Sequence, residues 1–272
     1  MFAYDSYYTM MKKYTISVLL LILGSVTSCS SGCASSKPLE VVSQNKLPRK
    51  SFVQIRHAIA MEGCKIDPET KKKKCQQAVG RSVSSGAYVF ISEVSYDTAY
   101  VLTAGHSCQN KVPKRQVVDG HIIKNLGSKF RVVNLDGTSN KAEVVSINNR
   151  YDLCVLRISN VLLHRPVIKT ALSPPIPGEL VYNLAAPHGL YWPNAVLLFR
   201  GIFSGYHTKG YSIYTIPTKP GSSGSPIVNK SGNLIGVIFA GYPVIENVGL
   251  SSPLAAIKIF LKKSIAKGEM EL

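Results

Sequence analysis

Short apolar segments alternate with polar or glycine-bearing turns along most of the chain between residues 51 and 241. These segments are rich in Val, Ile, Tyr and Phe, which is typical of β-strands rather than of helices. A helical spacing of apolar residues is sustained only from Pro253, and it predicts an amphipathic helix over about 253–264. The predicted strands are SFVQIRHAI, GAYVFIS, AYVLTA, FRVVNL, AEVVSI and CVLRI, followed by LVYNLA, AVLLFRGIFSG, YSIYTI, SPIVN and LIGVIFAG.

The strands fall into two consecutive groups, one over about 51–165 and one over about 175–250. A chain of 272 residues is long enough for one large domain or for two smaller cores. Two groups of about six short strands with one terminal helix indicate an all-β fold, built as two packed barrels or as a pair of sandwiches.

The N-terminal region has the layout of a secretory signal peptide. Lys12 and Lys13 precede an apolar segment over residues 16–23, and small residues follow. This apolar segment is far shorter than the roughly 20 residues that a transmembrane helix needs, so a membrane-spanning anchor is the weaker interpretation. We therefore expect residues 1–28 to be a signal peptide.

The segment Val26-Thr27-Ser28-Cys29 resembles the bacterial lipobox, in which the cysteine is lipidated and becomes the mature N-terminus. The alternative is a plain cleavage site followed by an incidental cysteine. Residues 29–50 are polar, small and interrupted by proline, which predicts a flexible tether before a folded domain over 51–265. We expect an exported protein of the bacterial cell envelope, in the periplasm or anchored to a membrane by lipid at Cys29.

The chain is basic, with a formal net charge of +17, and 45% of its residues are hydrophobic, which excludes a disordered composition. Such a charge is compatible with a well-solvated basic surface or with an acidic partner. No recognised motif supports a nucleic-acid partner, and no spacing of Cys and His indicates a metal site. We therefore expect no cofactor and no specific nucleic acid.

Three segments carry candidate chemistry. The stretch PGSSGSP (residues 220–226) has the composition of an ordinary turn, His106 follows a predicted strand, and Asp152 precedes another. Each has an ordinary structural explanation when it is taken alone. Together they supply the serine nucleophile, the base and the orienting acid that acyl transfer requires.

The segments LTAGHS, YDLCVLRI and KPGSSGSPIVNKSGNLIGV resemble those of trypsin-like (chymotrypsin-fold) serine proteases. Among these proteases, the segments are most similar to those of the HtrA/Deg protease domain, and the similarity extends over about residues 51–265. The segments GTSNKAEVVSINNRYD and GELVYNLAAPHGL also lie where HtrA-like domains carry comparable segments. The resemblance implies two six-stranded antiparallel β-barrels followed by a C-terminal helix. It also implies a serine endopeptidase acting on protein or peptide substrates.

The resemblance assigns a role to each motif residue. Ser223 corresponds to the nucleophile, in preference to Ser222 and Ser225. His106 corresponds to the general base, and Asp152 to the acid that orients it.

Two further points follow from the same resemblance. The backbone N–H groups of Gly221 and Ser223 correspond to the oxyanion hole. Asp97 is the competing acid, but it precedes the same strand that delivers His106, so Asp152 fits the family better.

The resemblance also locates the primary substrate pocket, which contains no acidic residue. We therefore expect a preference for a small or aliphatic side chain on the acyl side of the scissile bond. Ser222 stands where pancreatic-type enzymes have an aspartate, so activation by a newly cut N-terminus is not expected. The 49 residues after Ser223 are too few for a PDZ domain as well. The residues assigned to the pocket are Pro217, Thr218, Lys219, Ile238, Phe239, Ala240 and Gly241.

The cysteines are consistent with export. Cys64 and Cys75 flank the basic segment KIDPETKKKK and form the candidate disulfide, which would close a short hairpin. Cys108 lacks a partner at the position that relatives use, and Cys154 is expected to be a buried, unpaired residue.

A different class of function remains as an alternative. The fold could be a catalytically silent lipoprotein that uses its basic face, including residues 71–74, as a binding module.

Overall fold

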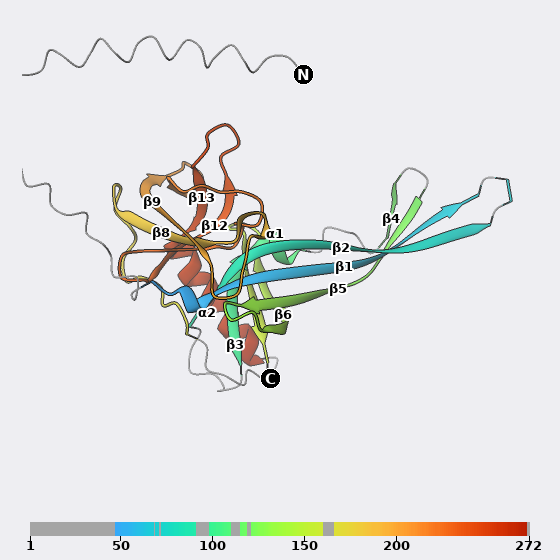
Figure 1. Cartoon of the computed structure of the whole chain (residues 1–272), viewed down its shortest axis with the longest axis horizontal. Helices are drawn as coiled ribbons and strands as arrows, with labels where there is room; N and C mark the ends of the chain where they lie inside the picture. Colours follow the sequence, from blue (N-terminus) through green and yellow to red (C-terminus); the bar gives the residue numbers. More distant parts are fainter. Residues whose placement is uncertain are drawn as a thin grey trace, which may run out of the picture. The chain divides into compact units, whose positions relative to one another are not determined.

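The structure is a computed structural model, and it describes residues 47–67, 69–70, 72–90, 98–109, 115–118, 121–159 and 166–270, with the side chains of 115, 116, 118, 121 and 265–270 excepted. The chain forms two closed six-stranded antiparallel β-barrels followed by a long C-terminal helix (Figure 1). This architecture confirms the expected all-β, two-barrel fold and excludes the sandwich pair.

The first barrel is closed by pairing between β1 and β5. The strand order around it is β1-β2-β3-β7-β6-β5, and β4 pairs with the outer part of β5 as an additional strand. The strands of this half are β1 (Phe52–Ile66), β2 (Lys73–Tyr88), β3 (Ala99–Ala104), β4 (Arg115–Val118), β5 (His121–Asn134), β6 (Ser139–Asn148) and β7 (Leu153–Ile158).

The second barrel has the strand order β10-β13-β12-β11-β8-β9 and is closed by pairing between β9 and β10. Its strands are β8 (Leu180–Ala185), β9 (Leu197–Tyr206), β10 (Ser212–Tyr214), β11 (Pro226–Val228), β12 (Leu234–Gly241) and β13 (Gly249–Pro253). The helical elements of the chain are η2 (Arg49–Ser51), α1 (Gly105–Cys108), η3 (Pro187–Gly189) and α2 (Leu254–Met270).

A shared apolar cluster joins the two barrels and α2. Each barrel also has an interior of its own, as the alternation of buried and exposed positions along its strands requires. Because the shared cluster contains residues of both barrels, its burial fixes the position of one barrel against the other. Its members include Leu102, Leu153 and Val155 from the first barrel, Val228, Leu234 and Val237 from the second, and Ile257, Phe260 and Leu261 from α2.

Strands β1 and β2 extend far beyond the first barrel as an antiparallel arm, defined here as residues 59–66 and 73–80, with β5 beside β1 (Figure 1). The pairing runs without interruption from Phe52 opposite Ala87 to Ile66 opposite Lys73. The hydrophobic pattern predicted only the inner parts of these strands. The residues of the arm on β2 are exposed or half-buried, so they lack the apolar alternation that identifies a barrel strand.

Among the described residues, two disulfides cross-link the first barrel and its arm. Cys64 and Cys75 lie directly opposite each other in the arm and are joined, with their Cα atoms 4.0 Å apart. The expectation that Cys154 is unpaired is wrong, because Cys154 is fully buried and bonded to Cys108. The pairing arises because α1 follows β3 directly, and β3 pairs with β7 through Thr103 opposite Cys154.

Among the described residues, no helix is both long enough and apolar enough to cross a membrane. The expected signal peptide over residues 1–28, the lipidation candidate Cys29 and most of the expected tether over 29–50 lie outside the described residues.

Helix α2 provides a first test of this packing. Ile257 is fully buried in the shared cluster, whereas Ile259 is 58% exposed on the same helix. The substitution Ile257→Ala should lower the free energy of unfolding by about 2–5 kcal/mol, because it leaves a cavity at the junction of the barrels. The matched control Ile259→Ala should change it by less than about 0.5 kcal/mol. Urea denaturation measures both values, and equal losses would contradict the packing described here.

The disulfide between Cys108 and Cys154 provides a second test. It spans a sequence separation of 46 residues within the first barrel, so replacing both cysteines by alanine should lower the free energy of unfolding by about 4 kcal/mol. The matched control is the double alanine variant of Cys64 and Cys75, which spans only 11 residues in the arm. Denaturation should show the smaller loss for the control pair, and the reverse order would argue against this assignment.

Candidate active site

His106 and Asp152 form a tightly bonded pair. The Nδ1 atom of His106 lies 2.5 Å from Oδ2 of Asp152, and the backbone N–H of His106 donates to Oδ1 of the same carboxylate at 2.6 Å. Gly105 adds a backbone bond from its N–H to the carbonyl of Asp152 at 2.8 Å. With Nδ1 donating to the carboxylate, the lone pair of the imidazole is on Nε2, which leaves that nitrogen available as a base.

The local backbone explains how this pair forms. Asp152 adopts a left-handed conformation with φ of 51° in the turn before β7, a conformation that aspartate tolerates better than most residues. Gly105 begins α1 directly after β3, and a Cβ there would lie 2.9 Å from Oδ1 of Asp152. Glycine at this position therefore allows the two loops to approach closely.

The disulfide holds these same two loops together. Cys108 follows His106 by two residues, and Cys154 follows Asp152 by two residues. The equal spacing was visible in the sequence, and it was the signal that could have identified the pair. The competing acid Asp97 lies outside the described residues.

Of the three serines in the glycine-serine loop, Ser223 is the one that reaches a surface hollow. Ser222 and Ser225 are buried, and the hydroxyl of Ser225 accepts a hydrogen bond from the side-chain amide of Asn183 at 2.8 Å. Ser223 is half-buried, and it lines the same hollow as His106 and Gly221. The structure therefore brings Ser223, His106 and Asp152 into one site.

Ser85 anchors the loop that carries Ser223. Its N–H donates to the carbonyl of Ser223 and its hydroxyl donates to the carbonyl of Gly221, each at 2.8 Å. The same hydroxyl accepts from the N–H of Ala186 at 3.0 Å. These bonds connect β2 of the first barrel to two segments of the second barrel.

The two glycines of this loop are required by its shape. Gly221 and Gly224 have φ values of 95° and 84°. A Cβ on Gly221 would lie 2.6 Å from the carbonyl oxygen of Ala186, and one on Gly224 would overlap the carbonyl oxygen of Ser85. Neither position admits a side chain without moving backbone.

The loop presents two free backbone donors. Among the described residues, no hydrogen-bond acceptor is found for the N–H of Gly221 or of Ser223. The carbonyl of Pro220 accepts a hydrogen bond from the N–H of His188 at 2.5 Å. Because the C=O and N–H of a trans peptide point in opposite directions, this bond orients the N–H of Gly221 away from His188.

The hollow with a volume of about 370 Å³ extends from these residues along β2. Its wall contains a buried imidazole, His57, whose ring stacks on Phe130 at 4.1 Å. Burial lowers the pKa of His57, so its imidazole is neutral at neutral pH. Its lining residues are His57, Ile59, Gly80, Arg81, Ser82, Val83, Ser84, His106, Ser107, Gln109, Pro220, Gly221 and Ser223. Neither His57 nor Arg81 stands in a motif, so sequence patterns had not placed them in the site.

A second hollow contains part of the substrate pocket expected from the sequence. It is lined by Pro217, Thr218, Lys219 and Gly241, together with the loop over residues 242–247. Lys219 forms an exposed ion pair with Glu246 of that loop at 3.3 Å. The structure does not bring the remaining pocket residues to this hollow.

Those residues lie elsewhere in the second barrel. Ile238 is buried in its interior, and Phe239 packs edge-on against Tyr211 with ring centroids 4.9 Å apart. Ala240 is half-buried on β12.

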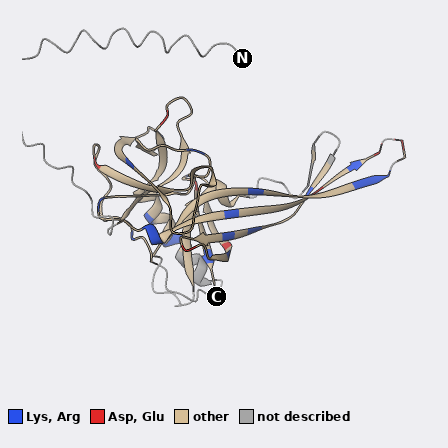
Figure 2. Cartoon of the chain, viewed as in Figure 1, with Lys and Arg blue, Asp and Glu red and all other residues tan. Residues whose placement is uncertain are grey.

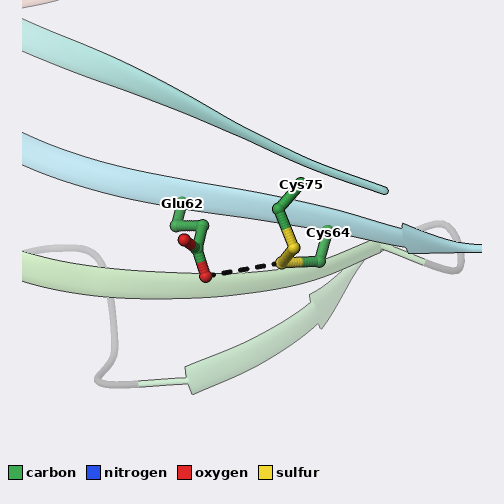
Figure 3. A group of neighbouring side chains, drawn as sticks. All are labelled: Glu62, Cys64 and Cys75. Atoms are coloured by element: carbon green, nitrogen blue, oxygen red, sulfur yellow. Dashed lines mark hydrogen bonds between the residues drawn. A yellow bond between two sulfur atoms is a disulfide. The ribbon is translucent and has the colours of Figure 1, made fainter. Parts of the chain in front are cut away.

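One group of side chains in the described residues has the spacing of a metal site. Glu62 lies beside the disulfide of Cys64 and Cys75 in the arm (Figure 3). Because the two sulfurs are bonded to each other, neither is a thiolate, and the group is therefore not a ligand set in this form.

Comparison with known proteins agrees with this geometry. Residues 85–237, more than half of the chain, match the family described as Trypsin-like peptidase domain. The chloroplastic Protease Do-like 1 of Arabidopsis thaliana is 31% identical over 160 residues, which cover 51% of this chain and 35% of that protein. The Serine protease Do-like HtrA of Bacillus subtilis is 26% identical over 169 residues, covering 57% of this chain and 37% of that protein. The chain thus matches little more than a third of the length of these relatives.

A solved structure supports the fold. The serine endoprotease from Yersinia pestis superposes with a TM-score of 0.56 at 20% identity, covering 82% of this chain and 65% of that chain. The match of its sequence over residues 85–237 and the two barrels around His106, Asp152 and Ser223 lead to one conclusion: the chain belongs to the trypsin-like peptidase family, with HtrA-like serine proteases among its relatives.

Proposed function

We propose that this protein is a serine endopeptidase in which Ser223, His106 and Asp152 form the catalytic triad. The observation that carries the proposal is the bidentate contact between Asp152 and His106 beside the only serine of the loop that reaches the hollow. The names of the curated relatives, which are proteases, support the same reaction class.

In the proposed first step, Nε2 of His106 removes the hydroxyl proton of Ser223 while Oγ attacks the scissile carbonyl carbon. Asp152 stays ionised and stabilises the resulting imidazolium through Nδ1. The imidazolium then gives its proton to the leaving amine, and the C–N bond breaks. An ester between Ser223 and the acyl part of the substrate remains.

In the second step, a water molecule replaces the leaving amine. His106 removes a proton from this water as the oxygen attacks the ester carbon, and the proton returns to Oγ of Ser223 when the ester bond breaks. The free N–H groups of Gly221 and Ser223 stabilise the negative oxygen that forms in both steps.

The expected preference for a small or aliphatic acyl-side residue belongs to this proposal. The expectation assumed a pocket without an acidic residue, but Glu246 lines the second hollow. Its support is that this carboxylate already pairs with Lys219. A Cβ on Gly241 would overlap the Thr218 hydroxyl, so glycine is what allows these two segments of the hollow to approach closely.

Export and a lipid anchor at Cys29 complete the proposal. They are supported by the leader-like pattern of residues 1–28 and by the two disulfides, which are typical of an oxidising compartment.

The nucleophile can be tested by covalent labelling. A fluorophosphonate probe should label the full chain at Ser223, because an activated hydroxyl displaces its leaving group, and peptide mapping identifies the site. Labelling should disappear in Ser223→Ala and also in His106→Ala, in which the hydroxyl remains but its base is lost. The substitution Ser231→Ala, in an exposed turn, is the control and should label normally.

A folded chain that is never labelled would overturn the proposal in this form. The alternative from the sequence, a silent binding module with a basic surface, would then be the better explanation.

The oxyanion hole can be tested at Gly221. The substitution Gly221→Ala should lower kcat by about a hundredfold to a thousandfold, because the Cβ displaces a backbone donor from its position. Gly210→Ala is the matched control: its φ of 81° imposes similar backbone strain, but a Cβ there meets no atom within 4 Å. Hydrolysis of an unfolded protein substrate measures both, and equal activities would argue against Gly221 as a donor.

A further inference from the structure

A strained segment, η3 (Pro187–Gly189), lies beside the glycine-serine loop. His188 and Gly189 both have left-handed backbone conformations, with φ values of 52° and 72°. Glycine adopts this conformation readily, but histidine adopts it only where surrounding contacts offset the strain. The N–H of His188 donates to the carbonyl of Pro220, which belongs to the same peptide as the N–H of Gly221. The conformation of η3 therefore decides the direction of a proposed oxyanion donor.

Two neighbouring side chains of the first barrel hold the ends of this segment. Gln54 of β1 lies directly opposite Ser85 of β2, so the two side chains point to the same face of the sheet. The hydroxyl of Ser85 accepts a hydrogen bond from the N–H of Ala186 at 3.0 Å. The side-chain amide of Gln54 donates to the carbonyl of Gly189 at 3.1 Å. His188 therefore lies between two points that the first barrel fixes.

The contact with Arg56 determines which end of the Gln54 amide faces η3. The Nε–H of Arg56 donates to Oε1 of Gln54 at 2.9 Å. An arginine side chain has only donors, so the atom that it contacts is the oxygen of the amide. The NH2 group is then the end that faces Gly189. Arg56 thus fixes the direction in which Gln54 donates.

Burial makes the bond from Gln54 to Gly189 difficult to replace. Gln54 is 2% exposed, so its amide cannot exchange this partner for bulk water, and an unpaired buried amide is costly. The segment also lies over Val83, because a Cβ on Gly189 would be 3.7 Å from a methyl group of that side chain. Such an apolar contact is not directional. The hydrogen bond from Gln54 is therefore the contact that sets the position of the Gly189 carbonyl.

From these contacts we infer that Gln54 is a positioning residue of the proposed oxyanion hole. Its amide holds Gly189, which keeps His188 in the conformation that orients the N–H of Gly221. Arg56 contributes by orienting the amide. Gln54 does not line the hollow beside Ser223, so it acts through η3 rather than on the substrate. The inference rests on the proposed protease function, because an oxyanion donor has a role only in that reaction.

Loss of the bond to Gly189 has a defined chemical consequence. Without it, His188 relaxes toward an ordinary backbone conformation and no longer donates to Pro220. The peptide between Pro220 and Gly221 is then free to rotate, and its N–H turns away from the developing negative charge. The oxyanion keeps the N–H of Ser223 but loses the other donor for part of the time. Since an oxyanion donor acts mainly in the transition state, kcat should fall while substrate binding persists.

Kinetics of two variants test the role of the Gln54 amide. Gln54→Leu removes the donor, and Gln54→Glu keeps an acceptor for Arg56 but places a carboxylate oxygen against the carbonyl of Gly189. Both should lower kcat for an unfolded protein substrate about tenfold, less than the loss of a whole oxyanion donor, and KM should change less than about twofold. The matched control is Ser264→Ala, which removes another buried side-chain bond, to the carbonyl of Phe260 in α2, and should keep the native kcat.

The contribution of Arg56 is tested against the arginine opposite it. Arg56→Leu should lower kcat about threefold, because the amide of Gln54 is no longer held in one orientation. Arg56→Lys retains a donor for Oε1 and should recover most of this loss. Arg131 pairs with Arg56 across β1 and β5, and its side chain donates to Ser139 instead. Arg131→Leu removes the same charge and should leave kcat unchanged, and equal losses in both leucine variants would contradict the role of Arg56.

Hydrogen exchange tests the effect on η3 without requiring hydrolysis. The N–H groups of His188, Gly189 and Leu190 each donate to a carbonyl in the native chain. Gln54→Leu should raise the exchange rate of the peptide over residues 186–190 about tenfold, the effect of one lost hydrogen bond, as measured by mass spectrometry. The control Ser264→Ala should exchange at the native rate in this peptide.

The outcomes separate this inference from the proposed protease activity. Hydrolysis with a native kcat in Gln54→Leu, or an equal loss in Ser264→Ala, would overturn the positioning role alone. A lower kcat without faster exchange would overturn the route through η3. Faster exchange in Gln54→Leu, together with a native chain that neither hydrolyses substrate nor reacts with the fluorophosphonate probe, would overturn the protease proposal but support the hold of Gln54 on η3. If neither hydrolysis nor faster exchange is seen, both are overturned.

Discussion

The site depends on the bonds that Ser85 makes across the junction of the two barrels. His106 and Asp152 belong to the first barrel, whereas Ser223 belongs to the second, so these three residues share one site only if the barrels keep a fixed position. The apolar cluster under α2 stabilises this relative position of the barrels. Apolar contacts are not directional, however, so they constrain the position less closely than hydrogen bonds do. Ser85 supplies directional contacts across the junction, because its N–H and its hydroxyl donate hydrogen bonds to two carbonyl groups of the loop that carries Ser223.

The same junction explains why the loop tolerates so little variation in shape. The carbonyls of Gly221 and Ser223 are held by Ser85. The N–H of Gly221 is oriented because it shares one peptide with the carbonyl of Pro220, which accepts a hydrogen bond from His188. His188 itself has a left-handed backbone with φ of 52°, an uncommon conformation for histidine. A strained backbone residue therefore lies directly beside the peptide that orients the N–H of Gly221. Both carbonyl groups are engaged, and neither N–H group has an acceptor in the part of the chain that the structure describes, so the loop can bind negative charge.

Much of the fold and the centre of the site could be predicted from the sequence, for definite physical reasons. Barrel strands bury one face, so their apolar residues alternate, and the loops around His106, Asp152 and Ser223 carry short motifs. The arm could not be predicted in the same way, because a ladder with both faces in water has no apolar period. The bond between Cys108 and Cys154 depends on the pairing of β3 with β7, and the inward position of Ile238 depends on the register of β12. Register of this kind is set by three-dimensional packing and is not visible in residue types.

Strand β2 takes part in the first barrel, in the candidate site and in the arm. Its last residues pair with β3 inside the barrel, and Ser85 holds the loop of Ser223. Among the described residues, no strand pairs with its outer edge before Ser85. An unpaired edge with exposed valines is a risk for aggregation, and natural proteins usually shorten or cover such an edge. Here the edge is extended by the arm, and β1, β2 and β5 together carry eight Lys and Arg residues against one acidic residue, Glu62 (Figure 2). Closure of the barrel does not account for the length of this charged edge, since β1 and β5 close that barrel without any contribution from the arm.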